Sequence, residues 1–256
     1  MYPTTIPLDL PAAPVSAKAS TTDYSLGSDA PSLAVGLDLG QATDFSALAV
    51  VEHVHVLPPD VSLGMFAHRV DTQLREPLFN VMPPATPELH VRHLQRWQLG
   101  TPYHAIVDDV CALMVTEDLW GARLYFDRSG VGRAVGDMMF AAYYAGRMGG
   151  SVPRGITITG GEKATPGGGR PKRDLMTSLQ LPIQQGRFRI AQGVPLGDVL
   201  ERELTGFKLR LSSSGQQSFD IGRRDGEGHG DLVIACALAV IDAPFGVRPR
   251  VVESSR

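Results

Sequence analysis

The chain has 256 residues, 43% of them hydrophobic, and a formal net charge of −3 at pH 7. This length and composition suit one sizeable α/β domain with its own core. The apolar runs are too short for a membrane-spanning helix, and the N-terminus lacks the basic and apolar regions of a signal peptide, so we expect a cytoplasmic protein. Cys111 and Cys236 lie in apolar, helix-like stretches and are expected to be reduced core residues.

The charges are unevenly distributed. Residues 1–119 contain 5 Lys/Arg and 14 Asp/Glu, a net charge of −9, whereas residues 120–230 contain 16 and 10, a net charge of +6. Residues 231–256 contain 3 of each. A basic segment in an otherwise acidic chain indicates a surface that faces a polyanion. An ordinary solvated surface is the alternative that charge alone leaves open.

The first part of the chain is predicted to form a tail and an antiparallel meander. Residues 1–31 are rich in Pro, Ala, Ser and Thr and show no periodicity, which is typical of a flexible tail. Residues 33–39 form a short apolar strand. Residues 46–56 form a second, with alternating residues at its end, and residues 63–70 a third.

Helices and strands then alternate along the chain. Apolar residues recur every three to four positions over 87–98, 104–119 and 131–145, which predicts three helices. "ARLYFD" at 122–127 and "GITITG" at 155–160 are predicted strands. Because helices separate them, these strands should add parallel pairs to the meander.

A Gly-rich basic loop at 159–174 precedes three further predicted helices. They span 174–185, 196–206 and 231–243, and the last is apolar nearly all round, so it should be buried.

A β-hairpin is predicted between the last two of these helices. Apolar and basic residues alternate over 207–211, "SSSGQQ" makes a turn, and 218–222 returns the chain. The folded domain is expected to cover 32–247, with a second tail at 248–256.

Three aspartates lie at the edges of strongly apolar elements. Asp38 is within the first strand, Asp127 ends "RLYFD", and Asp231 begins the last helix. A buried carboxylate without a partner costs several kcal/mol or becomes protonated, and three together would repel one another. Two Mg²⁺ or Mn²⁺ ions about 3.5–4 Å apart would resolve this repulsion, because both ions favour oxygen ligands. Asp44 could be a fourth ligand.

Each aspartate also has a structural interpretation. Asp231 suits the N-cap of the final helix, and Asp127 suits a turn before Ser129 and Gly130. Asp38 has the weakest such alternative, because an aspartate within a strand has no capping role.

The order of these motifs resembles the nuclease domain of phage large terminase subunits, which are ribonuclease H-like. The resemblance covers roughly residues 33–243. The matching stretches are "GLDLGQATDFSALAVVE", "LYFDRSGVGRAVGDMM", "ITITGG…GGGRPKRDLMTSLQLPIQQGRFRIAQGVPLGDVLERELTGFKLRL" and "GHGDLVIACALAV". It implies a mixed sheet, with an antiparallel meander and parallel strands, flanked by helices. It also implies a two-metal endonuclease that cuts double-stranded DNA during genome packaging, in the host cytoplasm, with a separate packaging ATPase and a portal as partners.

In this resemblance, Asp38, Asp127 and Asp231 would be catalytic metal ligands, and Asp44 matches an acidic position after the first strand. Basic residues would hold the DNA backbone; the candidates are Arg128, Arg133, Arg170, Lys172, Arg173, Lys208 and Arg210. Contacts of this kind carry little sequence information and depend strongly on salt. His229 could support the site or handle a proton, and a surface-loop histidine is the alternative.

Two departures from the family pattern stand out. Paired aspartates usually follow the histidine of the last motif, but here Gly230 takes the first place. The chain also carries no GxxxxGK[ST] phosphate loop, so it is not expected to power translocation.

Two other functional classes remain open. "GLDLGQATDFSALAVVE" also resembles the first phosphate-binding strand of the actin, hexokinase and heat-shock chaperone ATPases. An inactive ribonuclease H-like module that binds DNA or a partner is the third possibility.

Overall fold

A computed structural model of the chain describes residues 32–40, 44–54, 88–159, 169–213 and 230–241. The strands are β1 Ser32–Asp38, β2 Ala47–Val54, β3 Glu88–Arg96, β4 Arg123–Asp127, β5 Pro153–Ile156, β6 Ile158–Thr159, β7 Arg170–Pro171 and β8 Phe188–Ile190. The helices are α2 Tyr103–Met114, α3 Gly132–Tyr144, α4 Lys172–Gln184, α5 Gly197–Ser213 and α6 Asp231–Ala239, with a short 3₁₀ turn, η2, at Glu117–Leu119. Within these ranges no helix is both long and apolar enough to cross a membrane.

A six-stranded mixed sheet forms the centre of the molecule, in the order β5-β4-β1-β2-β3-β8. β2 runs antiparallel to both β1 and β3, whereas β4 is parallel to β1, β5 to β4 and β8 to β3. The predicted combination of an antiparallel meander with parallel strands is confirmed. β6 and β7 form a separate two-stranded ribbon.

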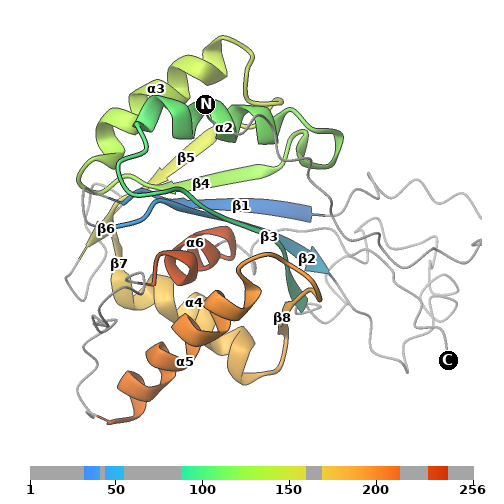
Figure 1. Ribbon diagram of the computed structural model, residues 1–256, viewed down its shortest axis with the longest axis vertical. Helices are drawn as coiled ribbons and strands as arrows, with labels where there is room; N and C mark the ends of the chain where they lie inside the picture. Colours follow the sequence, from blue (N-terminus) through green and yellow to red (C-terminus); the bar gives the residue numbers. More distant parts are fainter. Residues whose placement is uncertain (1–31, 41–43, 55–87, 160–168, 214–229, 242–256) are drawn as a thin grey trace, which may run out of the picture.

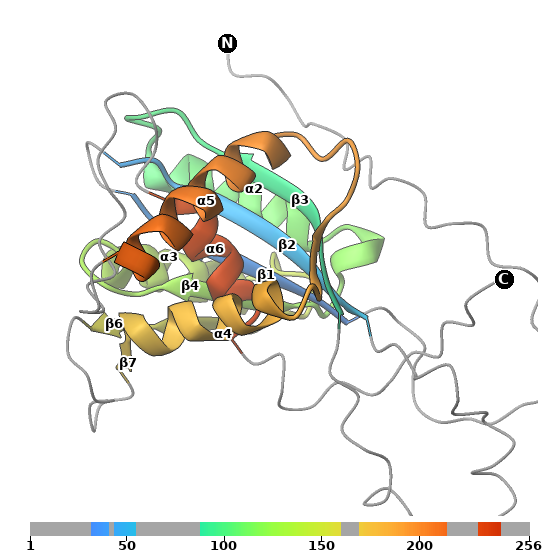
Figure 2. The same ribbon diagram turned by 90° about the horizontal axis from the view of Figure 1, so that it is seen from below.

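Helices cover both faces of the sheet (Figure 1). Alternate residues of a strand point to opposite faces, so Val35 and Leu37 pack in the cluster with α2 and α3. On the other face, Ala47 and Tyr125 pack in the cluster with α4, α5 and α6. Figure 2 shows this second face, where the three helices lie across the strands.

The helix α6 packs directly on the sheet. Every residue of α6 is buried, as its apolar sequence predicts, and it contacts β1, β2, β4, α4 and α5. Gly36 makes this close approach possible, since a Cβ at this position would lie 2.0 Å from the carbonyl oxygen of Ala235 and 2.6 Å from the amide nitrogen of Ala239. Cys111 and Cys236 are buried free thiols, as predicted.

Two sequence predictions of secondary structure are wrong. The residues 87–98, expected to form a helix, instead contain the strand β3. This strand is the third of the meander and pairs antiparallel with β2. The first arm of the hairpin, 207–211, lies instead within α5, which runs on to Ser213. The spacing of Leu200, Leu204 and the apolar residues that follow fits a helix as well as a strand.

Other predictions lie outside the described residues. These are the tails, the strand at 63–70, the hairpin's return strand at 218–222, and most of the Gly-rich loop. The strand β8 was not predicted from the sequence, because it has only three residues.

Candidate active site

The first two aspartates lie side by side at the ends of neighbouring parallel strands. In the register of β1 and β4, Ala34 pairs with Arg123 and Leu37 with Phe126. Continuing it by one residue puts Asp38 beside Asp127. Parallel strands lie about 4.8 Å apart with matched side-chain directions, so both carboxylates point to the face that α6 covers.

The same row of the sheet continues across β2 and β3. Asp38 pairs with Ala47, and Ala47 pairs with Arg96. Antiparallel partners point to the same face of a sheet. The side chains of this row therefore all face the layer of α4, α5 and α6; they are those of Asp127, Asp38, Ala47 and Arg96. The helix α6, which begins with Asp231, packs on this face of the sheet in the same cluster as Ala47.

The charge of Asp38 is opposed by its surroundings. Burial raises its pKa well above the usual value, and the charges of Asp127 and Asp231 raise it further. The ammonium of Lys172, at the start of α4, acts in the opposite direction. Four predicted site residues therefore influence one another, although they come from four different elements.

Asp127 has a raised pKa for the same main reason, burial. Hydrogen bonds to Ser129 and Ile158 and the charge of Lys172 limit this rise. The backbone N–H of Ser129 donates to Asp127 Oδ1 over 2.7 Å, so the turn role anticipated for Asp127 is present as well. A carboxylate held by a turn after a buried strand has a fixed position and direction.

Asp231 is held at the buried start of α6. Only 4% of its surface is exposed, and its Oδ2 lies 4.0 Å from Nη2 of Arg96. It is the first residue of the helix, where the partial positive charge of the helix N-terminus favours a carboxylate. The residue in the capping position is Gly230, in a left-handed conformation with φ of 81°. Gly230, and not Asp231, therefore occupies the N-cap position that the structural interpretation gave to Asp231.

Glu203 and Arg96 were missed by the sequence analysis. Glu203 is 8% exposed, pairs with Arg96 and accepts a hydrogen bond from the N–H of Val233 over 3.3 Å. Burial raises its pKa, and Arg96 opposes that rise. The signal in the sequence is that Glu203 lies between Leu200 and Leu204 on the apolar face of its helix.

The donor chemistry at this site fits a hard divalent cation. Asp38, Asp127 and Asp231 offer only oxygen atoms, as Mg²⁺ and Mn²⁺ prefer, and burial together with the charges of Asp127 and Asp231 raises the pKa of Asp38. Among the residues that the structure describes, no group of three or more Asp, Glu, His or Cys side chains is arranged so that it could hold a metal ion.

Asp44 lies near the site through its backbone. A Cβ on Gly40 would come within 2.2 Å of the carbonyl oxygen of Asp44, so the chain folds back against the residues that follow Asp38. Its carboxylate stays a predicted ligand.

The predicted DNA-binding residues have several positions. Arg128 and Arg133 are exposed beside Asp127 and at the start of α3, and Arg173 is exposed at the start of α4. Arg170 is half-buried in β7. Two more, Lys208 and Arg210, belong to α5, where only the backbone is described, and His229 lies outside the described residues. Their role in binding stays a prediction.

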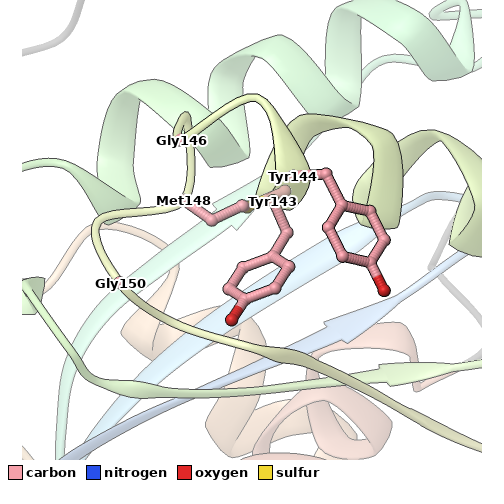
Figure 3. A pocket seen from close by; sticks show the side chains of 5 residues that line it. All are labelled: Tyr143, Tyr144, Gly146, Met148 and Gly150. Atoms are coloured by element: carbon pink, nitrogen blue, oxygen red, sulfur yellow. The ribbon is translucent and has the colours of Figure 1, made fainter.

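A shallow pocket lies away from these carboxylates (Figure 3). It is lined by Tyr143, Tyr144, Gly146, Met148 and Gly150, from the end of α3 and the loop before β5. This loop leads into the start of β5, whereas Asp127 ends the neighbouring parallel strand β4. The pocket and the carboxylates thus lie at opposite ends of these strands.

The strand order β3-β2-β1-β4-β5, with only β2 antiparallel, defines a ribonuclease H-like fold, and it carries acidic residues at the ends of β1 and β4. The solved structure of the large terminase nuclease from thermophilic phage G20c is similar to this chain. The TM-score is 0.44 and the sequence identity is 20%, over 81% of this chain and 80% of that one. Comparison with family models and with curated proteins finds no match.

Proposed function

We propose that this protein is a metal-dependent endonuclease that cleaves double-stranded DNA by a two-metal mechanism during viral genome packaging. One observation carries the proposal. Asp38, Asp127 and Asp231 come from three elements to one face of the sheet, where burial and then the charges of Asp127 and Asp231 raise the pKa of Asp38. Such an accumulation of negative charge destabilises a fold unless a ligand compensates it, which is typical of functional sites.

In this mechanism the fold would hold three carboxylates in place as metal ligands. The two strand ends hold Asp38 and Asp127 at a fixed spacing, and the buried helix α6 brings Asp231 over them. These three aspartates would hold Mg²⁺ or Mn²⁺, with Asp44 as a further ligand. When bound, divalent cations activate water and neutralise charge on the oxygens of a phosphodiester.

The basic residues near the carboxyl ends of β1 and β4 would bind the DNA backbone. Arg133 and Arg173 each lie in the first turn of a helix, so their positive charge adds to that of a helix N-terminus. Lys172 lies near both Asp38 and Asp127, where it could meet a phosphate next to the scissile bond. A packaging ATPase and a portal are the partners that this function entails.

A plasmid cleavage assay tests the proposal. The purified protein is incubated with supercoiled plasmid and Mn²⁺ or Mg²⁺, with EDTA as the blank, and compared with Asp38→Asn. Asp118→Asn, at an exposed position of the turn η2, is the matched control. We expect cleavage that needs the metal, is lost in Asp38→Asn and is retained in Asp118→Asn.

Two other outcomes would support the competing classes. Binding and hydrolysis of ATP without DNA cleavage would favour an ATPase related to actin and hexokinase. DNA binding without cleavage or ATP hydrolysis would favour an inactive ribonuclease H-like module. Cleavage that is equal in wild type and Asp38→Asn would show that the activity does not come from this site.

A further inference from the structure

A buried ion pair lies beside the proposed site and belongs to none of the predicted functional residues. Glu203 of α5 contacts Arg96 of β3 through Oε1, while its Oε2 accepts the backbone N–H of Val233 in the first turn of α6. One carboxylate therefore joins a strand and two helices at the point where Asp231 enters the site.

Arg96 is held on three sides. Its Nη2 contacts Glu203 and lies 4.0 Å from Oδ2 of Asp231, and its guanidinium carbon lies 5.1 Å from the centre of the Phe45 ring. The planar guanidinium can serve both carboxylates at once, whereas an ammonium is a point charge without this geometry. The arrangement fixes the guanidinium between Glu203 and Asp231.

Stability alone is a weak explanation for this pair. Glu203 and Arg96 have side chains that are only 6% and 14% exposed, and removing two charges from water costs about as much as their attraction returns. Apolar side chains of the same size would stabilise such a position equally well. An ion pair whose cation also faces a candidate metal ligand has a further consequence, because it constrains that ligand.

We propose that Glu203 and Arg96 are positioning residues for Asp231. Glu203 fixes the first turn of α6 through Val233 and orients Arg96, and Arg96 orients the Asp231 carboxylate toward Asp38 and Asp127. This inference rests on the proposed function, because Asp231 is positioned for the binding of a divalent cation. Partners that orient a metal ligand commonly contribute about 10–100-fold to metal affinity.

The chain offers a matched control pair. Glu52 and Arg92 form a second ion pair, with Nε of Arg92 donating to Oε2 of Glu52 over 2.7 Å. Glu52 is 7% exposed, close to the 8% of Glu203. Glu52 pairs with Leu33 near the start of β1, whereas Asp38 ends that strand. Disrupting this pair should affect stability without affecting Asp231.

The experiment measures Mn²⁺ binding, with the full chain in each case. Free Mn²⁺ is followed by electron paramagnetic resonance for wild type, Glu203→Gln, Arg96→Lys, Glu52→Gln and Asp38→Asn. Gln at 203 keeps an acceptor for the N–H of Val233 but loses the charge. We expect the Kd for Mn²⁺ to rise about 10–100-fold in Glu203→Gln and less in Arg96→Lys, which keeps the positive charge. Glu52→Gln should bind as wild type does.

Hydrogen exchange supplies a second readout that needs no metal. The amides of 231–234 should exchange faster in Glu203→Gln than in Glu52→Gln, because the amide oxygen of Gln is a weaker acceptor for the Val233 N–H than the carboxylate is. Thermal unfolding in EDTA shows whether each variant is folded and how much stability it has lost.

The outcomes separate this inference from the proposed function. If wild type binds Mn²⁺ and Asp38→Asn does not, but Glu203→Gln binds as wild type does, the positioning role is overturned while the metal site stands. A loss of affinity that is equal in Glu203→Gln and Glu52→Gln also overturns it, because it would then reflect stability alone. If wild type binds no Mn²⁺, the proposed function and this inference fail together.

Discussion

Asp38 is a charged residue at a position where its charge is unfavourable. It ends a strand whose neighbours are almost entirely buried, and two other carboxylates raise its pKa. A functional site often contains groups that reduce the stability of the fold. The stability of the protein without metal should therefore increase when this charge is removed.

Asp38→Asn should unfold at a higher temperature than wild type in EDTA at pH 8. Asparagine has the same shape but no charge, and we expect a gain of about 1 kcal/mol, which is about 2–4 °C for a domain of this size. Differential scanning calorimetry measures the change. With Mn²⁺ at 100 times its Kd, wild type should gain about 2.7 kcal/mol, and Asp38→Asn should gain little. A variant that melts below wild type in EDTA would contradict the role of charge repulsion.

His93 allows a prediction about pH. Burial lowers its pKa below the usual value, and a hydrogen bond with Gln95 opposes this only in part. The unfolded chain therefore binds the proton more readily, so this residue's contribution to stability is present above the unfolded pKa near 6.5. It is lost as the pH falls from there through the lower pKa of the folded protein. The slope from a single group cannot exceed about 1.4 kcal/mol per pH unit.

His93→Gln should flatten the pH dependence of unfolding between about pH 7 and pH 5. Urea unfolding at several pH values measures the slope for wild type and for the variant. His104→Gln, on the exposed side of α2, controls for the loss of a histidine as such. An unchanged slope in His93→Gln would contradict the prediction.

The sequence shows the three aspartates of the site but not the residues that hold them. Asp38, Asp127 and Asp231 are recognisable because each interrupts or borders an apolar run. Glu203 lies on the apolar face of its helix, but the sequence does not show that Arg96 is its partner, because that contact depends on how α5 packs against α6. Contacts between residues 107 positions apart have no local signal in the sequence.

At the level of elements, the strand β3 shows how a bulge misleads a prediction from periodicity. Val50 pairs with His93 and Val51 with Val91, so one extra residue lies in β3 between them. The apolar residues that face α4–α6 are Leu89, Val91 and Leu94, spaced by two and then by three. A strict alternation is lost, and the remaining spacing resembles that of a helix.

The contact between α6 and β1 leads to a prediction at this scale. Gly36→Ala should lower the free energy of unfolding by about 3 kcal/mol, the upper range for overpacking, since its Cβ would meet backbone atoms that cannot easily move. Denaturant unfolding followed by circular dichroism measures it. A displaced α6 should also weaken Mn²⁺ binding, because Asp231 moves with the helix.

Gly206→Ala in α5 is the matched control for this substitution. A Cβ at Gly206 would meet nothing within 4 Å, so alanine should stabilise the helix by about 0.5–1 kcal/mol. If both substitutions changed stability equally, the close approach of α6 to β1 would not be the cause.

At the scale of the whole molecule, the distribution of charge agrees with the position of the site. The basic segment 120–230 supplies the turn after β4 and the helix α4 with its Lys172, all of them near the carboxylates. The acidic first part of the chain supplies β1–β3 and α2. The order of strands in the sheet thus brings basic residues to the carboxyl ends of β1 and β4, where Asp38 and Asp127 lie. A polyanion would contact these basic residues there.

This arrangement predicts how DNA binding depends on salt. Arg133→Gln combined with Arg173→Gln should reduce the slope of log K against log salt concentration by about 2, since each phosphate contact contributes about 0.9. Fluorescence anisotropy with a labelled duplex, measured between 50 and 200 mM KCl (roughly the range over which such contacts are lost), gives the slope. All proteins carry Asp38→Asn so that the duplex is not cut.

Arg147→Gln is the matched control for these two substitutions. Arg147 is exposed, pairs with Asp108 of α2, and lies in the loop that contains the pocket, away from the site. Arg147→Gln changes the net charge as much as either of the other substitutions does. If the DNA contacts are local, the salt dependence of DNA binding should be the same in Arg147→Gln as in its parent. The slope of log K against log salt concentration could instead fall equally for Arg147→Gln and for each single substitution at 133 and 173. Overall charge, and not the region around the carboxyl ends of β1 and β4, would then set the affinity for DNA.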